Sequence, residues 1–301
     1  MKEINIIKHS NVWLSMAVIV MLSSVILIAM FGLRPGIDFT GGSLLEIKFS
    51  QIRPENKEIV TVLNKMNLSE NVVQKTGANS VIIRTKFLEE NSHQELLKAL
   101  GQKFSANNNT ITESRFETIG AAVSKQLRSR SIWAVFFVVL SIVLYVAYAF
   151  RKVSRPVESW KYGILAIVAL VHDVLVVLGV FAVLGKIWGV EINIPIVVAL
   201  LTVLGYSVND TIVIYDRIRE NILRTRWENF GDVINTGLNQ SLMRSINTTI
   251  TTLMPLFALF FIGGSTIHYF SLALIIGIAS GAYSSIFIAS PLLVIIGSQK
   301  K

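Results

Sequence analysis

The stretch VWLSMAVIVMLSSVILIAMFGL, residues 12–33, decides what kind of fold this chain adopts. Its 22 residues include no charged side chain, and about 20 predominantly apolar residues are enough for an α-helix to cross the hydrocarbon core of a bilayer. The run is longer than the apolar core of a signal peptide, and no clear cleavage site of small residues follows it. We therefore expect a transmembrane helix over 12–33 that is an uncleaved anchor.

Five further apolar runs follow along the chain, at 131–150, 162–185, 192–215, 245–264 and 269–297. Of the 301 residues, 52% are hydrophobic and 16% are charged, against roughly 25% charged in ordinary soluble domains. This composition excludes a typical soluble enzyme and predicts an α-helical polytopic membrane protein with six transmembrane helices. The sequence contains no cysteine, which excludes disulfides and thiolate metal sites, and we expect neither a metal nor a cofactor.

Lys and Arg are distributed very unequally among the short loops, and this distribution predicts the orientation of the spans. Thirteen of them lie in the two termini and in the loops after the second and fourth spans, whereas the opposite short loops carry only Lys186. Residues 1–11, loop 217–244 and residues 298–301 are therefore expected in the cytoplasm of a bacterial inner membrane, and 34–130 in the periplasm. The net charge of +9 reflects this topology and an affinity for anionic membrane lipids; it requires no nucleic acid.

Segment 34–130 contains alternating strand and helix patterns, which predict a small α+β periplasmic domain. The element order β-α-β-β-α-β is typical of a ferredoxin-like fold. Residues 76–79 suit a hairpin turn and 107–109 a second turn, Ser92 is a candidate N-cap, and His93 is expected to be solvated. We find no catalytic constellation in it and expect no enzymatic activity. The expected strands are 43–49, 71–74, 80–85 and 111–118, and the expected helices are 54–66 and 92–104.

The connection from the first span to this domain is rich in glycine. Gly36, Gly41 and Gly42 lie within eight residues of Pro35, together with Asp38. Because glycine allows positive φ and close backbone approach, the segment is expected to form a shaped turn. A hinge or docking feature and a tight linker are both compatible with it.

Two carboxylates lie within the predicted spans, where ionisable groups are costly and are functional candidates by default. Asp173 follows His172 in the third span, and Asp210 lies in the fourth, three residues after Ser207 and beside Asn209. Residues three apart share a helix face.

The start of the fifth span carries a matching polar face, formed by Arg244, Thr248 and Thr251. Because consecutive spans are antiparallel, Asp210 and Arg244 are expected to face each other across a hydroxyl-lined seam. A carboxylate whose contact with a guanidinium varies can take up and release a proton, so the pair suits an ion relay. A fixed interhelical polar contact is the alternative, and position alone does not decide between them.

Two further segments carry recognisable patterns. Gly277 and Gly281 form a small-xxx-small seam in the sixth span, which allows another helix to approach closely; tight packing within the chain is its expected use. Loop 217–244 mixes arginines with Trp227, Phe230, Val233 and other apolar residues, and this mixture predicts an interfacial amphipathic segment.

Four motifs together resemble the SecD/SecF family of bacterial protein-export membrane proteins. They are GIDFTGG at 36–42, His172-Asp173, GYSVNDTIVIYDRIREN at 205–221 and RSINT at 244–248. The resemblance extends in order over nearly the whole chain, and the short outer segment is similar to that of SecF, the smaller member of the pair.

The resemblance implies a function in protein export, within the resistance–nodulation–division superfamily. It implies that SecD contributes six more helices, that the pair associates with the SecYEG channel, and that flow of H⁺ or Na⁺ drives periplasmic movements that draw the preprotein outward. The family's relay aspartate falls on Asp210 and its relay arginine on Arg244, with Asp173 as a further candidate.

Three other functions are possible in principle. Half of a small-molecule exporter from the same superfamily should have larger outer domains. An intramembrane aspartyl protease should have a second catalytic motif, and Asp216 lies beside Arg217 where an ordinary surface carboxylate is expected. A structural assembly subunit without ion flux is distinguished only by the behaviour of Asp210 and Arg244.

Overall fold

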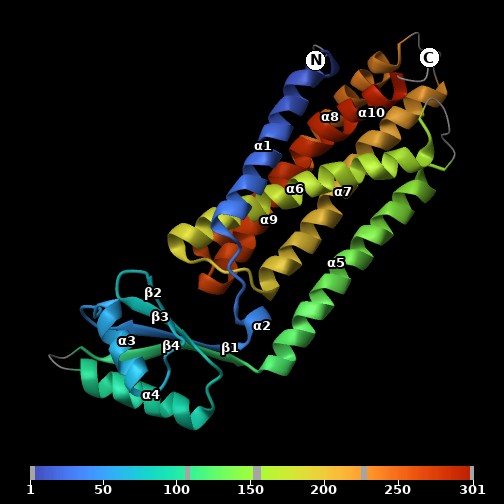
Figure 1. Ribbon diagram of the computed structural model, residues 1–301. Coiled ribbons are helices and arrows are strands. Elements are labelled where there is room, and N and C mark those ends of the chain that lie inside the picture. The colour runs from blue at the N-terminus through green and yellow to red at the C-terminus, as the bar shows by residue number, and fades with distance from the viewer. Residues whose placement is uncertain (1–3, 106–108, 152–156, 225–228, 299–301) are drawn as a thin grey trace. The chain divides into compact units, whose positions relative to one another are not determined.

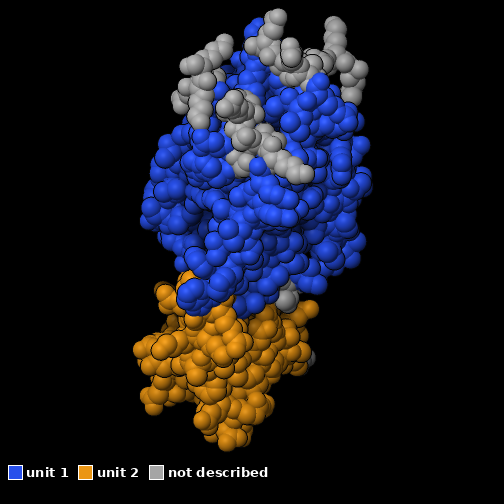
Figure 2. Space-filling model, turned by 90° about the vertical axis from the view of Figure 1, so that its right-hand side faces the viewer, with its two compact units in different colours: residues 1–34, 133–301 blue, residues 35–132 orange. Residues whose placement is uncertain are grey.

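The computed structural model describes residues 4–105, 109–151, 157–224 and 229–298. The chain divides into two compact units, which are coloured separately in Figure 2. One unit comprises Met1–Arg34 and Trp133–Lys301, and the other comprises Pro35–Ile132. Each unit has a hydrophobic core of its own.

In the described ranges, six helical stretches are long and apolar enough to cross a membrane, which confirms the predicted polytopic helical fold (Figure 1). A 3₁₀ turn at Ile7–His9 precedes the first of them. The sixth is a composite of two α-helices joined by a π-helical turn. The stretches are α1 (Ser10–Phe31), α5 (Ala121–Ala149), α6 (Ser159–Trp188), α7 (Ile194–Arg224), α8 (Phe230–Ile262), and α9 (Ser265–Ser284) with the π-turn Ser285–Ala289 and α10 (Ser290–Ser298).

Several helices extend well beyond the apolar runs. α7 continues to Arg224, and α8 begins at Phe230, where the Asn229 side chain accepts a hydrogen bond of 3.0 Å from the Gly231 amide. The prediction of a separate interfacial segment is therefore wrong for its described residues. Val233, in the first turn of α8, is buried in the bundle, and Trp227 lies outside the described residues. Hydropathy marks the membrane-embedded length, whereas the helical hydrogen bonds continue past it.

α6, α7 and α9 form the centre of the bundle, since each packs against the other two. α1 packs on α6, and α8 packs on α7 and α9. The end of α5 joins the core through Phe150, whose ring lies 5.2 Å from that of Tyr162 and 5.9 Å from that of Tyr215. Most of the apolar surface of α5 is exposed.

Glycines set the contact between α9 and α7. A methyl group added at Gly277 would lie 2.3 Å from a methyl carbon of Val203, and one added at Gly281 would lie 2.8 Å from Cβ of Ser207. Ordinary carbon–carbon contacts are about 3.5–4.0 Å. These two helices therefore approach closely only because both positions lack a side chain, and the contact is within the chain.

The second unit is the predicted β-α-β-β-α-β domain. Its antiparallel sheet has the order β2-β3-β1-β4, which is that of a ferredoxin-like fold. Ile47 of β1 pairs with Val81 of β3, and Gly42 at the start of β1 pairs with Ile119 at the end of β4. α5 begins only two residues later, at Ala121. The elements are α2 (Ile37–Thr40), β1 (Gly42–Phe49), α3 (Asn56–Lys65), β2 (Val72–Thr76), β3 (Ser80–Thr85), α4 (Glu90–Phe104) and β4 (Ile111–Ile119).

Two predictions for α4 are wrong. The helix starts at Glu90 with Glu89 in the N-cap position, so Ser92 is not the cap. His93 is buried rather than solvated, and its ring stacks on that of Phe116 with centroids 3.7 Å apart and an interplanar angle of 1°. The predicted turn at 107–109 lies mostly outside the described residues.

Candidate functional site

Asp173 is completely enclosed in the bundle, with no exposed surface. Its Oδ2 accepts hydrogen bonds from the hydroxyls of Ser207 at 2.6 Å and Ser284 at 2.8 Å. Its Oδ1 accepts one from the Ser280 hydroxyl at 2.8 Å and lies 3.1 Å from Nδ1 of His172. Each carboxylate oxygen thus has two partners, which is close to the full capacity of an ionised carboxylate.

The partners of Asp173 come from three helices. Asp173 and His172 lie on α6, Ser207 on α7, and Ser280 and Ser284 one turn apart on α9. Because hydrogen bonds to a charged acceptor are stronger than those between neutral groups, this cluster holds the three central helices together. Nε2 of His172 is buried without a hydrogen-bond partner among the described residues.

A second group of hydroxyls continues from this cluster along α7. Thr211 and Ser285 are hydrogen-bonded at 2.7 Å, and both lie within bonding distance of the Ser207 carbonyl, at 3.2 and 3.3 Å. Ser290 donates to the Ser285 carbonyl, which lies in the π-turn, at 3.0 Å. Such single π-turns occur often at functional sites.

Asp210 has a very different environment from Asp173. It is buried against α8, and the hydroxyl of Ser245 donates a short hydrogen bond to its Oδ2. Among the described residues this is its only hydrogen bond, and no ion pair within 4.0 Å joins it to Arg244. Asp210 therefore keeps acceptor capacity that Asp173 has already used.

The other predicted polar residues are placed as follows. The hydroxyl of Ser207 bonds Asp173 rather than lining the seam with α8. Asn209 is exposed, and so are Thr248 and Thr251, whose hydroxyls donate to carbonyls of their own helix. The seam that sequence reasoning assigned to these residues is formed in the structure by other groups, since Tyr206 bonds Thr252 across it at 3.2 Å.

Sequence reasoning missed three direct partners of the carboxylates. Ser280 and Ser284 stand four apart on α9, and this spacing places both hydroxyls on one helix face. Ser245 follows Arg244 directly and therefore lies on a different face of α8. Asp210 is bonded by this serine and not by the predicted arginine. Only the spacing of the first two serines was a usable signal, because which helices face each other is a tertiary property.

The glycine-rich connection folds as a short helix, which two positive-φ glycines join to the strand β1. Gly36 is the N-cap of α2, Asp38 lies in its first turn, and Gly41 ends it with φ of +75°. Gly42 has φ of +113°, and a side chain there would place Cβ 2.6 Å from the Thr85 carbonyl oxygen. The last two positions thus require glycine for the turn from α2 into β1.

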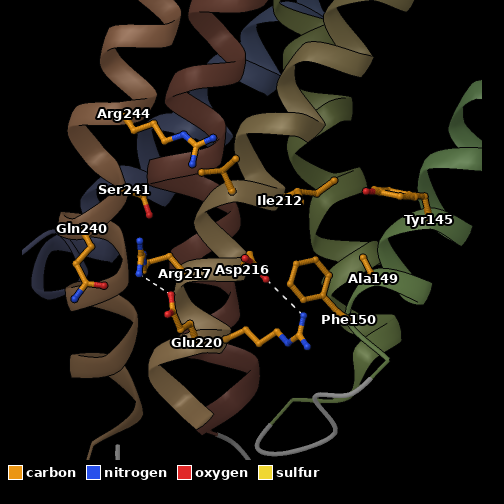
Figure 3. A pocket seen from close by; sticks show the side chains of 12 residues that line it. Tyr145, Ala149, Phe150, Ile212, Asp216, Arg217, Glu220, Gln240, Ser241 and Arg244 are labelled. Carbon is orange, nitrogen blue, oxygen red and sulfur yellow. Dashed lines mark hydrogen bonds and ion pairs between the residues drawn. The ribbon is translucent and has the colours of Figure 1, made fainter. Parts of the chain in front are cut away.

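A pocket of about 430 Å³ lies between α5, α7 and α8, beside one end of the apolar run of each helix. In Figure 3, Tyr145 and Ala149 of α5 lie across the pocket from Gln240 and Ser241 of α8. Its other lining residues are Phe150, Ile212, Val213, Asp216, Arg217, Arg219, Glu220 and Arg244. In the described part of the chain, no group of three His, Cys, Asp or Glu side chains is arranged to hold a metal ion.

The chain forms a multi-pass helical bundle with a ferredoxin-like domain inserted after the first helix. Carboxylates are buried among hydroxyls inside the bundle, and this combination defines a membrane protein of the transporter class. Comparison with family models identifies the family. Residues 99–299 match the C-terminal part of the protein export membrane proteins SecD/SecF, and residues 26–51 match the SecD/SecF GG motif. The chain belongs to the SecD/SecF family.

Relatives and solved structures agree with this assignment. The chain is 44% identical over 302 residues to protein translocase subunit SecF of Thermobaculum terrenum, with 97% of this chain and 93% of the relative covered. Identity to SecF of Vibrio alginolyticus is 35%, with 100% and 92% covered. The crystal structure of SecDF from Thermus thermophilus, a translocon-associated membrane protein, matches with a TM-score of 0.84 at 31% identity. That match covers 97% of this chain but only 38% of the SecDF chain.

Proposed function

We propose that this chain is a SecF-like accessory subunit in protein export and that it works together with a SecD subunit. Nearly full-length similarity to proteins named SecF supports the subunit assignment. The solved SecDF chains, of which this chain spans about two fifths, support SecD as the partner. The SecYEG channel and the translocating preprotein are the further partners of this proposal.

Within this function, we assign ion transfer to Asp210 and Arg244. The observation that carries the assignment is that Asp210 has only one hydrogen bond among the described residues, that from Ser245. Its carboxylate is therefore able to gain a proton or a cationic partner. Arg244 is exposed on the neighbouring face of α8 and has no acidic partner within 4.0 Å among the described residues. A movement of α8 against α7 would bring its charge closer to Asp210 or withdraw it, and so change the proton affinity of the carboxylate.

Asp173 takes a secondary part in this proposal. Four partners already surround it, so the acceptor capacity of its carboxylate is largely used within the chain. Its cluster holds α7 in position, and α7 carries Asp210. Asp173 therefore supports the relay through the placement of α7, and direct ion transfer at Asp173 is the weaker assignment.

The rest of the proposal concerns orientation and movement. The charge asymmetry of the loops supports cytoplasmic termini and a periplasmic ferredoxin-like domain. The glycine turn at 36–42 is then the hinge or docking feature through which that domain is joined to α1. Its two positive-φ glycines, Gly41 and Gly42, restrict which residues this connection accepts.

The Asp210→Asn variant tests the relay. We expect normal abundance and normal copurification with SecD, but loss of the export that an imposed ion gradient stimulates in reconstituted vesicles. Arg244→Lys should lose a substantial part of that stimulation, because charge remains while the planar fork is lost. Asp232→Asn, an exposed carboxylate in the first turn of α8, is the matched control and should behave like the unmodified chain.

Two outcomes separate the alternatives. Full gradient-stimulated export with Asp210→Asn would exclude the relay assignment. Loss of SecD binding in the same variant would instead identify Asp210 as a structural contact. Imposing a proton gradient and a sodium gradient separately identifies the coupling ion.

A further inference from the structure

The pocket between α5, α7 and α8 combines an apolar wall with an excess of positive charge. Tyr145 and Ala149 of α5 form the wall together with Phe150, which follows α5. Ile212 and Val213 continue the wall on α7. Three arginines face two acids in the lining, namely Arg217, Arg219 and Arg244 against Asp216 and Glu220.

The charges of this pocket are only partly neutralised within the chain. Arg217 pairs with Glu220, and Arg219 lies 3.5 Å from Asp216. Glu220 is shared with Arg224, which lies outside the lining. Arg244 has no acidic partner within 4.0 Å among the residues that the structure describes. The pocket is therefore suited to an anion that the chain itself does not supply.

The position of the pocket indicates where this anion comes from. Its wall is continuous with the exposed apolar surface of α5, where Leu144, Tyr145 and Tyr148 are each more than half exposed. At the end of the same helix, the Arg151 guanidinium lies 3.7 Å from the centre of the Tyr148 ring. Aromatic and basic side chains of this kind are enriched at the level of lipid headgroups.

From this geometry we propose that the pocket binds the headgroup of an anionic phospholipid. The lipid phosphate contacts Arg217 and Arg244, and the acyl chains lie along the exposed face of α5. A pocket of about 430 Å³ is within the usual range for small-molecule sites, and basic pockets between membrane helices are known to bind anionic headgroups. The proposal requires that the chain spans a membrane, and it shares Arg244 with the proposed ion relay. Its test variants leave Arg244 and Asp210 unchanged, so its failure and the failure of the relay are distinguishable.

The test uses the full chain, copurified with SecD and placed in phosphatidylcholine vesicles with a trace of photoactivatable phosphatidylglycerol. We expect crosslinks on the peptides that contain Ala149 and Gln240. Unlabelled phosphatidylglycerol should compete for them, whereas added phosphatidylcholine and free inorganic phosphate should not.

Three variants make the test specific. Arg217→Gln should lower the crosslink yield about fivefold, the effect of one arginine near a headgroup. Ala149→Trp should lower it by filling the pocket without a change of charge. Arg224→Gln is the matched control, because it also removes one positive charge from α7 but at a residue that does not line the pocket. It should leave the crosslink yield unchanged.

Several results would overturn the proposal. Equal labelling by a photoactivatable phosphatidylcholine would show that the pocket does not select an anionic headgroup. Competition by inorganic phosphate would identify a site for free phosphate instead of a lipid. An equal loss with Arg217→Gln and Arg224→Gln would show diffuse surface attraction. If Arg217→Gln fails to copurify with SecD, an unchanged yield with Ala149→Trp would by itself refute the proposal.

Discussion

Replacement of Gly281 by alanine should loosen the contact that presents Asp173 to its serines. The new Cβ would lie 2.8 Å from Cβ of Ser207, so α9 and α7 would have to separate by about 1 Å to restore an ordinary contact. Asp173 on α6 accepts hydrogen bonds from Ser207 on α7 and from two serines on α9. It cannot follow both helices when they separate, so at least one of these bonds would exceed the distance at which such a bond forms.

The magnitude follows from these two effects. Overpacking of this kind costs about 1–3 kcal/mol, and loss of a hydrogen bond to a charged group costs about 1.5–3 kcal/mol. We therefore expect Gly281→Ala to lower the free energy of unfolding by about 4 kcal/mol, as the sum of the midpoints of these ranges. Denaturant unfolding in mixed micelles, followed by circular dichroism, measures this difference.

Two further variants make the result interpretable. Gly205→Ala is the matched control on α7, because a methyl group there would meet no atom within 4 Å, and alanine is the better helix former. Ser207→Gly in the Gly281→Ala chain should recover the part of the loss that is due to the clash, since it removes the opposing Cβ. A Gly281→Ala chain as stable as Gly205→Ala, or no recovery in the double variant, would refute the reasoning.

Three other variants test the buried polar groups. Asp173→Asn should lower the free energy of unfolding by about 3 kcal/mol, because four partners lose an ionic acceptor; unchanged denaturant unfolding would contradict the cluster's structural role. His93→Ala should destabilise the ferredoxin-like domain by about 3 kcal/mol through loss of the ring that stacks on Phe116, and a thermal midpoint like that of the unmodified chain would contradict this. The hydrogen bond from Gln94 to the Glu90 carboxylate, with a smaller contribution from His93, holds the pKa of Glu90 below its ordinary value. Gln94→Ala should raise that pKa, as measured by NMR titration. The stability contributed by the lowered pKa is complete above the ordinary carboxyl pKa and is lost as the pH falls through the lowered value; an unshifted titration would exclude the assigned cause.

The helical fold and the strand positions could be predicted because each depends on a short periodic pattern. The predicted strand 80–85 coincides with β3, because its Val and Ile side chains favour a strand and Val81 and Ile83 share one buried face. Helix ends could not be predicted from hydropathy. The predicted apolar run begins at residue 245, whereas α8 begins at Phe230, because polar residues can form helical turns as well as apolar residues can. His93 was misjudged because a lone histidine on a helix gives no local sign of whether a strand covers it.

The polar interior shows the same limit more clearly. Asp210 and Asp173 were recognisable because ionisable groups in apolar runs are rare. Their partners were not recognisable, since Ser207 shares a helix face with Asp210 in sequence but bonds Asp173 in the structure. A difference of a fraction of a turn in helix rotation decides between the two, and no pattern along one helix specifies rotation against its neighbours.

The pairing of Gly42 with Ile119 at the open end of the β1–β4 ladder has a mechanical consequence. The chain enters the ferredoxin-like domain beside Gly42 and leaves it beside Ile119, so both covalent attachments are made at one place. A force that pulls the two attachments apart would therefore load the hydrogen bonds at this end of the β1–β4 ladder before those of any other part of the sheet.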